Sequence, residues 1–209
     1  MNWYKTSQSL SNIVYHGTIA SLAQKIEQDG IISPRGSGPG NWSGGFFGGN
    51  PSDPDSVYCF FSKDAAIKYA KEISSITKAQ GVAVIHAVPD YNLAMPDEDQ
   101  VADYLSDTNP SSSEPGVKEV WEAYRRMIQE DRNPEWGNVS MDEAFDGFHA
   151  TNEMMEGSDN VDASYSEMVK DVARKMKSIM SQEDLLQFVG RGGSIAFNGP
   201  LKVAKVEYI

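Results

Sequence analysis

His16 and Gly17 stand side by side where a short apolar stretch, Ile13 to Tyr15, gives way to a helical pattern. A neutral imidazole donates a hydrogen bond through its N–H, and a glycine, which has no Cβ, lets a ligand approach the backbone closely. Tyr58 and Tyr69 follow later, and their rings offer surfaces for stacking. These residue types suit hydrogen bonding and ring stacking with a ligand. The three histidines and the single cysteine are scattered along the chain, so no metal site is expected.

The predicted elements place these residues at junctions. Residues 13–15 read as a strand, and Thr18 is predicted to cap a helix that ends at Gly30. Residues 33–55 are rich in glycine and proline and include three large aromatic side chains, which is typical of a functional loop rather than a linker. The apolar stretch 57–62 predicts a second strand.

Helices and strands alternate irregularly after that point. Ser62 is predicted to cap a helix that carries Tyr69, and the valine-rich stretch 82–88 is typical of a buried central strand. Four stretches have helical periodicity, and two short strands separated by Asn198-Gly199-Pro200 end the chain. The order predicts one α+β domain over residues 1–209, with a helical insertion at about 97–190. The four helical stretches are 117–128, from Ser140 onward with a Ser140–Glu143 capping box, 164–180 and 182–190.

The composition limits the partners and the compartment. A formal charge of −12 and a pI near 4.6 argue against broad attraction to nucleic acid or to an anionic membrane. Cys59 is the only cysteine, which excludes an intrachain disulfide and favours a reducing compartment. No stretch has the length of an apolar membrane span or of a signal-peptide core. We therefore expect a soluble, cytoplasmic protein that does not bind membranes.

The series of motifs resembles the ADP-ribosyltransferase superfamily, in the His-Tyr-Glu branch of the poly(ADP-ribose) polymerases and diphtheria toxin. In that branch a strand ends in His-Gly-Ser/Thr, a helix ending in glycine follows, and a loop leads to a strand and helix that each carry a tyrosine. Here the matching parts are residues 15–18, the helix to Gly30, the loop 33–55, the strand 57–62 and Tyr69. The resemblance covers residues 13–95 well and the last strands weakly, and it implies a split β-sheet core flanked by helices.

The resemblance implies that NAD is the substrate. His16 would then donate to the hydroxyl of the adenosine-side ribose, Gly17 would pair its backbone N–H and C=O with the nicotinamide carboxamide, and Tyr58 and Tyr69 would enclose the nicotinamide ring. His16 and Tyr58 would be the catalytic residues. Thr18 and Ser62 would cap their helices or reach the NAD. The enzyme class implied is a mono-ADP-ribosyltransferase, effector-like, whose acceptor is a protein or a nucleic acid.

The third residue of the family triad, a glutamate, is the main departure. Its carboxylate stabilises the oxocarbenium-like transition state that forms as nicotinamide leaves. Aligning the late strand puts Gly193 or Ser194 at that position, and neither is acidic. Glu183, Glu153 and Glu156 are the candidates to replace it.

Three alternatives therefore remain open. The chain could be a module that binds NAD or ADP-ribose without turnover, or an interaction protein. It could also resemble RNA 2′-phosphotransferases, which share the His-Gly-Thr motif and hold phosphate with arginines, here Arg35 and Arg191. His86 and His149 are expected to be structural, and the acidic stretch 95–99 is expected to be a solvated turn.

Overall fold

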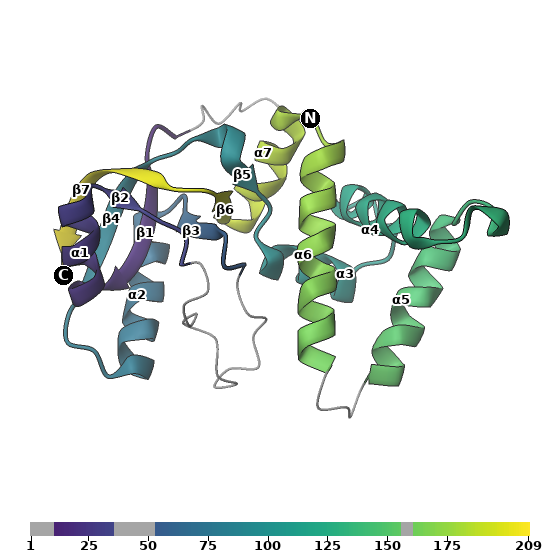
Figure 1. Cartoon of the computed structure of the whole chain (residues 1–209), viewed down its shortest axis with the longest axis horizontal. Coiled ribbons are helices and arrows are strands. Elements are labelled where there is room, and N and C mark those ends of the chain that lie inside the picture. The colour runs from purple at the N-terminus through teal and green to yellow at the C-terminus, as the bar shows by residue number, and fades with distance from the viewer. Residues whose placement is uncertain (1–10, 36–52, 156–160) are drawn as a thin grey trace.

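The computed structural model describes residues 11–35, 53–155 and 161–209 (Figure 1). They form an α+β fold around a seven-stranded antiparallel sheet with the strand order β2-β7-β4-β1-β3-β6-β5. The strands are β1 (Val14–Ile19), β2 (Ile31–Ile32), β3 (Ser56–Phe60), β4 (Val82–Val88), β5 (Ala94–Met95), β6 (Ser194–Asn198) and β7 (Leu201–Tyr208). The helices are α1 (Ala20–Asp29), α2 (Lys63–Thr77), α3 (Glu98–Asp107), α4 (Val117–Asp131), α5 (Met141–Met155), α6 (Val161–Ile179) and α7 (Gln182–Gly192), with 3₁₀ turns η1 (Tyr91–Leu93) and η2 (Pro134–Trp136).

The helices divide into two groups along the chain. Helices α1 and α2 pack against the sheet, α2 mainly on β1 and β4. Helices α3 to α7 follow β5 and precede β6, and in Figure 1 the members α4, α5 and α6 stand beside the sheet, on the side away from α1 and α2. Within the described ranges, no helix is both long and apolar enough to cross a membrane. The core is continuous between the sheet and the second group of helices, and its largest buried side chains include Trp121, Phe148, Phe188, Phe197 and Ile85.

Most of the predicted helix ends are confirmed. The side chain of Ser62 accepts a hydrogen bond from the Ala65 backbone N–H, and Gly30 ends α1 in the left-handed conformation at φ 71°. The capping box at α5 is also present, because Ser140 accepts from the Glu143 N–H while Glu143 accepts from the Ser140 N–H.

The prediction that Thr18 caps the first helix is wrong. Thr18 lies inside β1, where it is buried and pairs with Ala83 of β4. The residue before α1 is Ile19, which makes no side-chain cap. Consequently the strand does not end at His16 and Gly17 but continues through them for another two residues.

Replacing Ser140 with alanine is expected to lower the free energy of unfolding by about 1 kcal/mol. The substitution removes the oxygen that accepts from the Glu143 N–H at 3.2 Å and leaves that donor without its cap. Chemical denaturation measures the change. Ser75, which is exposed in the last turn of α2, provides the control, because Ser75→Ala replaces a helical serine without removing an N-cap. Equal losses in the two variants would contradict the prediction.

Candidate functional site

The sheet is nearly split between β1 and β3. Strand β1 pairs with β4 along its whole length, from Val14 to Ile19, but with β3 at one position only, Tyr15 opposite Phe60. If the two strands stayed together in the same register beyond His16 and Cys59, Gly17 would lie opposite Tyr58. Because they separate instead, a gap opens in the sheet at those two residues.

The backbone of Gly17 faces this gap. In an antiparallel pair, residues that exchange hydrogen bonds alternate with residues that do not. Ala20 N donates to Gly81 O at 3.1 Å, which marks the even-numbered residues of β1 as the ones that bond to β4. The N–H and C=O of Gly17 therefore point the other way, toward β3, where the described residues supply no strand partner. Gly17 thus presents one donor and one acceptor next to each other.

Gly17 is also required by packing. A Cβ on this residue would lie 2.1 Å from the backbone oxygen of Ala66 and 3.3 Å from the Cβ of Ala70, both on α2. The absence of a side chain lets α2 lie directly on β1. Gly17 therefore serves the fold on one face of the sheet and presents its polar backbone groups at the gap.

His16 connects the two strands across the gap. Its Nδ1 lies 2.9 Å from the backbone oxygen of Tyr58. A carbonyl oxygen only accepts hydrogen bonds, so this contact assigns the proton to Nδ1. Burial lowers the pKa of His16, and the hydrogen bond to Tyr58 raises it by less, so the ring is neutral at pH 7. Nε2 then carries a lone pair, which revises the expected role: toward a ribose hydroxyl this ring accepts rather than donates.

The hydroxyl of Tyr58 is held between two partners. It accepts from the Asp53 backbone N–H at 2.6 Å and donates to Glu98 Oε2 at 2.7 Å. Burial raises the pKa of this hydroxyl, and the Glu98 carboxylate raises it further, so Tyr58 remains protonated. Tyr58 thus contacts His16 through its carbonyl group and Glu98 through its side chain.

Tyr69 of α2 packs beside Phe60 of β3. Its ring centroid is 5.4 Å from that of Phe60, the residue two positions after Tyr58 in β3. The structure therefore gathers His16, Gly17 and Tyr58 at the gap and places Tyr69 beside Phe60. Ser62 lies at the end of β3 as the cap of α2, whereas Thr18 is buried within β1.

Glu98 is the residue that sequence reasoning missed. The stretch 95–99, predicted to be a solvated turn, instead runs from the end of β5 into the start of α3, and Asp97 and Glu98 are buried with exposed fractions of 9% and 4%. Asp97 caps the helix by accepting from the Asp99 N–H, and the prediction of a solvated turn is wrong. The sequence signal that could have revealed this helix is the four-residue spacing of Val101 and Leu105, with Asp97 as an N-cap residue before them.

Burial dominates the electrostatics of Glu98. It raises the pKa of this carboxyl to about 7; the Tyr58 hydrogen bond lowers the value, and the nearby Asp97 raises it. One oxygen, Oε2, accepts from Tyr58, while the buried Oε1 has no hydrogen-bond partner. A buried carboxylate oxygen without a donor is unusual and calls for an explanation.

The strand position at which the family glutamate was expected lies next to this acid. Ser194 opens β6 opposite Phe60, and its side chain hydrogen-bonds to Asp97. Gly193, the other aligned residue, ends α7 in the left-handed conformation. Of the acids considered as replacements, Glu183 is exposed on α7, and Glu156 and the side chain of Glu153 lie outside the described residues.

No known protein-family model, curated protein or solved structure matches this chain. The geometry of the site is therefore the basis for a functional assignment.

The remaining residues that the sequence analysis named lie outside the gap between β1 and β3 or have a structural role. Arg191 packs near Gly116 at the start of α4, so it does not join His16 in a phosphate clamp. The ring of His86 meets the Tyr15 ring edge-on, with Nε2 3.3 Å from Glu207 Oε2, and His149 packs on the rings of Phe145 and Phe148. Among the side chains described, no group of three or more His, Cys, Asp or Glu residues could hold a metal ion.

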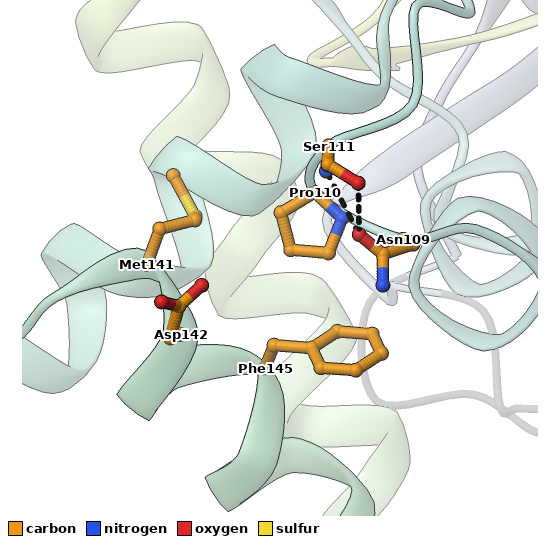
Figure 2. Close-up of a pocket in the computed structure, with 6 residues that line it drawn as sticks. All are labelled: Asn109, Pro110, Ser111, Met141, Asp142 and Phe145. Atoms are coloured by element: carbon orange, nitrogen blue, oxygen red, sulfur yellow. Dashed lines mark hydrogen bonds between the residues drawn. The ribbon is translucent and has the colours of Figure 1, made fainter.

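A surface cavity of about 380 Å³ lies far from this site, between the α3–α4 connection and α5 (Figure 2). Asn109 uses its side-chain oxygen to accept from the N–H and hydroxyl of Ser111. Figure 2 shows Asp142 and Phe145 on the opposite wall, without a dashed contact to Asn109 or Ser111. The polar groups on the Asn109 side thus satisfy one another, and the cavity lacks a converging set of catalytic groups. Its lining residues are Asn109, Pro110, Ser111, Met141, Asp142 and Phe145.

Proposed function

We propose that this protein is an NAD-dependent mono-ADP-ribosyltransferase. It breaks the bond between nicotinamide and ribose in NAD and transfers ADP-ribose to a macromolecular acceptor. The observation that carries the proposal is the gap between β1 and β3, with the backbone of Gly17 facing it and His16 and Tyr58 on its borders.

The gap suits the nicotinamide end of NAD. A primary carboxamide has an NH₂ donor and a carbonyl acceptor side by side, and Gly17 offers the complementary acceptor and donor. The sheet supplies these groups in fixed positions because β1 is held by β4 on its other edge. The partly buried rings of Phe60 and Tyr69 provide an aromatic surface nearby for the nicotinamide ring.

The protonation states support binding of a neutral ribose hydroxyl. His16 is neutral and has Nε2 available as an acceptor, so it can orient the ribose without adding positive charge. This matters because the other ribose of NAD, the one bonded to nicotinamide, becomes positively charged as nicotinamide leaves. An imidazolium at that position would oppose the reaction, whereas a neutral imidazole does not.

The test is the release of nicotinamide from NAD, measured with the full chain alone and with cell lysate as a source of acceptor. His16→Ala is expected to reduce release by about 100-fold, because it removes a group that positions the ribose. His149→Gln is the matched control, since His149 packs on α5 and lies outside the gap. Thermal unfolding of each variant shows whether it remains folded.

Equal activity in wild type and His16→Ala would contradict the proposal. Saturable NAD binding without nicotinamide release would instead favour a module that binds NAD without turnover, an alternative that the serine at position 194 motivates. Absence of NAD binding, with turnover of 2′-phosphorylated RNA, would favour the phosphotransferase.

A further inference from the structure

We propose that the outer edge of β7 is an interaction surface for a second copy of this chain. The two β7 strands pair antiparallel across a twofold axis at Val206 and join the two sheets into one. This inference goes beyond the proposed function and does not depend on it. In the strand order, β4 and β1 separate β7 from the gap, so pairing at this edge leaves the gap open.

Most of the outer edge of β7 is unpaired. Strand β2 has only two residues and pairs with the first two residues of β7. The Val203 N–H then donates to Gly30 O at 3.0 Å, and beyond that bond the described part of the chain places no strand on this side of β7. Residues 204–208 therefore form an open edge. An open edge can pair with a strand of another chain through its backbone groups.

The backbone groups that face outward can be assigned from one hydrogen bond. The Ile209 N–H donates to Val82 O at 2.9 Å, which marks the odd-numbered residues at this end of β7 as the ones that bond to β4. The N–H and C=O of Val206 and Tyr208 therefore point away from β4, toward the open edge. Each of these two residues offers one donor and one acceptor to an incoming strand.

The charges on β7 select a second copy as the partner and fix the register. In a twofold antiparallel pair, one residue lies opposite itself. With Val206 at that position, Lys205 of each copy lies opposite Glu207 of the other, which gives two pairs of opposite charge. Centring the pair on Lys205 or on Glu207 would instead place like charges opposite each other. Val206 also faces outward, so its N–H and C=O meet the same groups of the second copy.

The two charged side chains are already placed for this exchange. Glu207 accepts from Lys63 at 2.5 Å, which holds its carboxylate on the face of the sheet that carries α2. The side chain of Lys205 is 62% exposed and lies 3.4 Å from Glu207 Oε2. An edge lysine alone discourages pairing with another strand. Here a glutamate two residues later makes the edge complementary to itself.

Exposed apolar side chains gather at the same end of the sheet. Six large hydrophobic side chains of the described residues are exposed, and five of them belong to α1, β2, β4 or β7 or directly follow β7. These elements lie together in Figure 1. A group of exposed apolar side chains at one edge is typical of a protein interface, whereas a single one needs no explanation. The five are Leu22, Ile31, Val88, Tyr208 and Ile209, and the sixth is Trp136.

Sedimentation equilibrium of the full chain tests the pairing. Wild type is expected to approach twice the monomer mass of 23.0 kDa as concentration rises, in physiological salt, which screens the repulsion between two acidic chains. Lys205→Glu places like charges opposite each other twice and is expected to raise the dimer Kd by at least about tenfold. Lys118→Glu is the matched control, because it makes the same charge change on an exposed residue of α4.

Oxidative cross-linking tests the register. Val206→Cys is expected to form a disulfide-linked dimer, because directly opposite residues of a hydrogen-bonded pair have Cα atoms about 5.5 Å apart. Tyr208→Cys is the control, because its two copies are offset by four residues, or about 13 Å, along the paired strands. Cys59 is buried, so wild type is expected not to cross-link.

Each result supports the pairing or overturns it. A wild type that stays monomeric at every concentration overturns it. A dimer that Lys205→Glu leaves as stable as wild type uses another surface, and so does a dimer that cross-links equally through Tyr208→Cys. Thermal unfolding of each variant shows whether it remains folded. Nicotinamide release is measured separately, so the pairing can fail while the proposed function stands, and the reverse.

Discussion

Gly17→Ala is expected to lower the free energy of unfolding by about 3 kcal/mol, or to prevent folding. The new Cβ would lie 2.1 Å from the backbone oxygen of Ala66, a distance that no real Cβ contact tolerates. A backbone oxygen inside a helix cannot rotate away, so α2 would have to move off β1. Ala66, Ala70 and Ile73 form the buried face of that helix, and any shift would loosen the packing of all three.

The measurement is chemical denaturation, with Gly147→Ala as the control. Gly147 lies in helix α5, where an added Cβ meets no atom within 4 Å. Alanine there is expected to raise stability by up to about 1 kcal/mol, because it is the better helix former. A Gly17→Ala protein as stable as wild type would show that α2 can yield at this point, contrary to the packing argument.

This packing requirement changes how Gly17 can be tested. A loss of activity in Gly17→Ala would follow from displacement of α2 as readily as from a lost contact to nicotinamide. The variant therefore measures the fold, and the role of Gly17 in binding has to be judged from its backbone groups. His16 is a better test of function, because its replacement leaves α2 in place.

Elements with strong periodicity could be predicted from the sequence, and the gap could not. The valine-rich β4, the capped helices α2 and α5 and the last two strands all follow from local patterns. The separation of β1 from β3 depends on which residues face each other across two strands that are about 40 positions apart in the chain. No local pattern encodes this pairing.

Thr18 shows how tertiary pairing overrides a local signal. A threonine before a helical stretch is a typical cap, and the sequence supported that role. Strand β4, however, pairs with β1 as far as Ile19, which lies opposite Val82. Thr18 is therefore part of the sheet, opposite Ala83. The hydrogen bonds of a central strand outweigh one capping contact.

Glu98 was missed for a related reason. Three acids in a row after Pro96 indicate a solvated turn if each charge is assumed to need water. In the structure these acids begin a helix, where backbone N–H groups favour negative charge, and the Tyr58 hydroxyl takes one carboxylate oxygen. The partner that makes burial possible lies 40 residues away in the sequence, so only the fold reveals it.

The buried carboxyl of Glu98 is expected to make the folded protein less stable as pH rises. Its pKa is about 7 in the folded protein and near 4.5 ordinarily, so the folded state holds this proton more tightly than the unfolded chain does. The stabilisation from Glu98 is therefore complete below about pH 4.5, falls as pH rises, and is lost above about pH 7. A difference of this size in pKa corresponds to about 3 kcal/mol.

Denaturation of wild type and Glu98→Gln between about pH 4 and about pH 8 isolates this contribution. Relative to the variant, wild type is expected to lose about 3 kcal/mol over that range, because glutamine does not ionise. Other buried acids such as Asp97, whose pKa burial also raises, act in both proteins and largely cancel in the difference. Glu183→Gln removes an exposed carboxylate and is expected to follow wild type at every pH. Parallel pH profiles for wild type and Glu98→Gln would mean that the carboxyl of Glu98 ionises as it does in water, and the prediction of a raised pKa would be wrong.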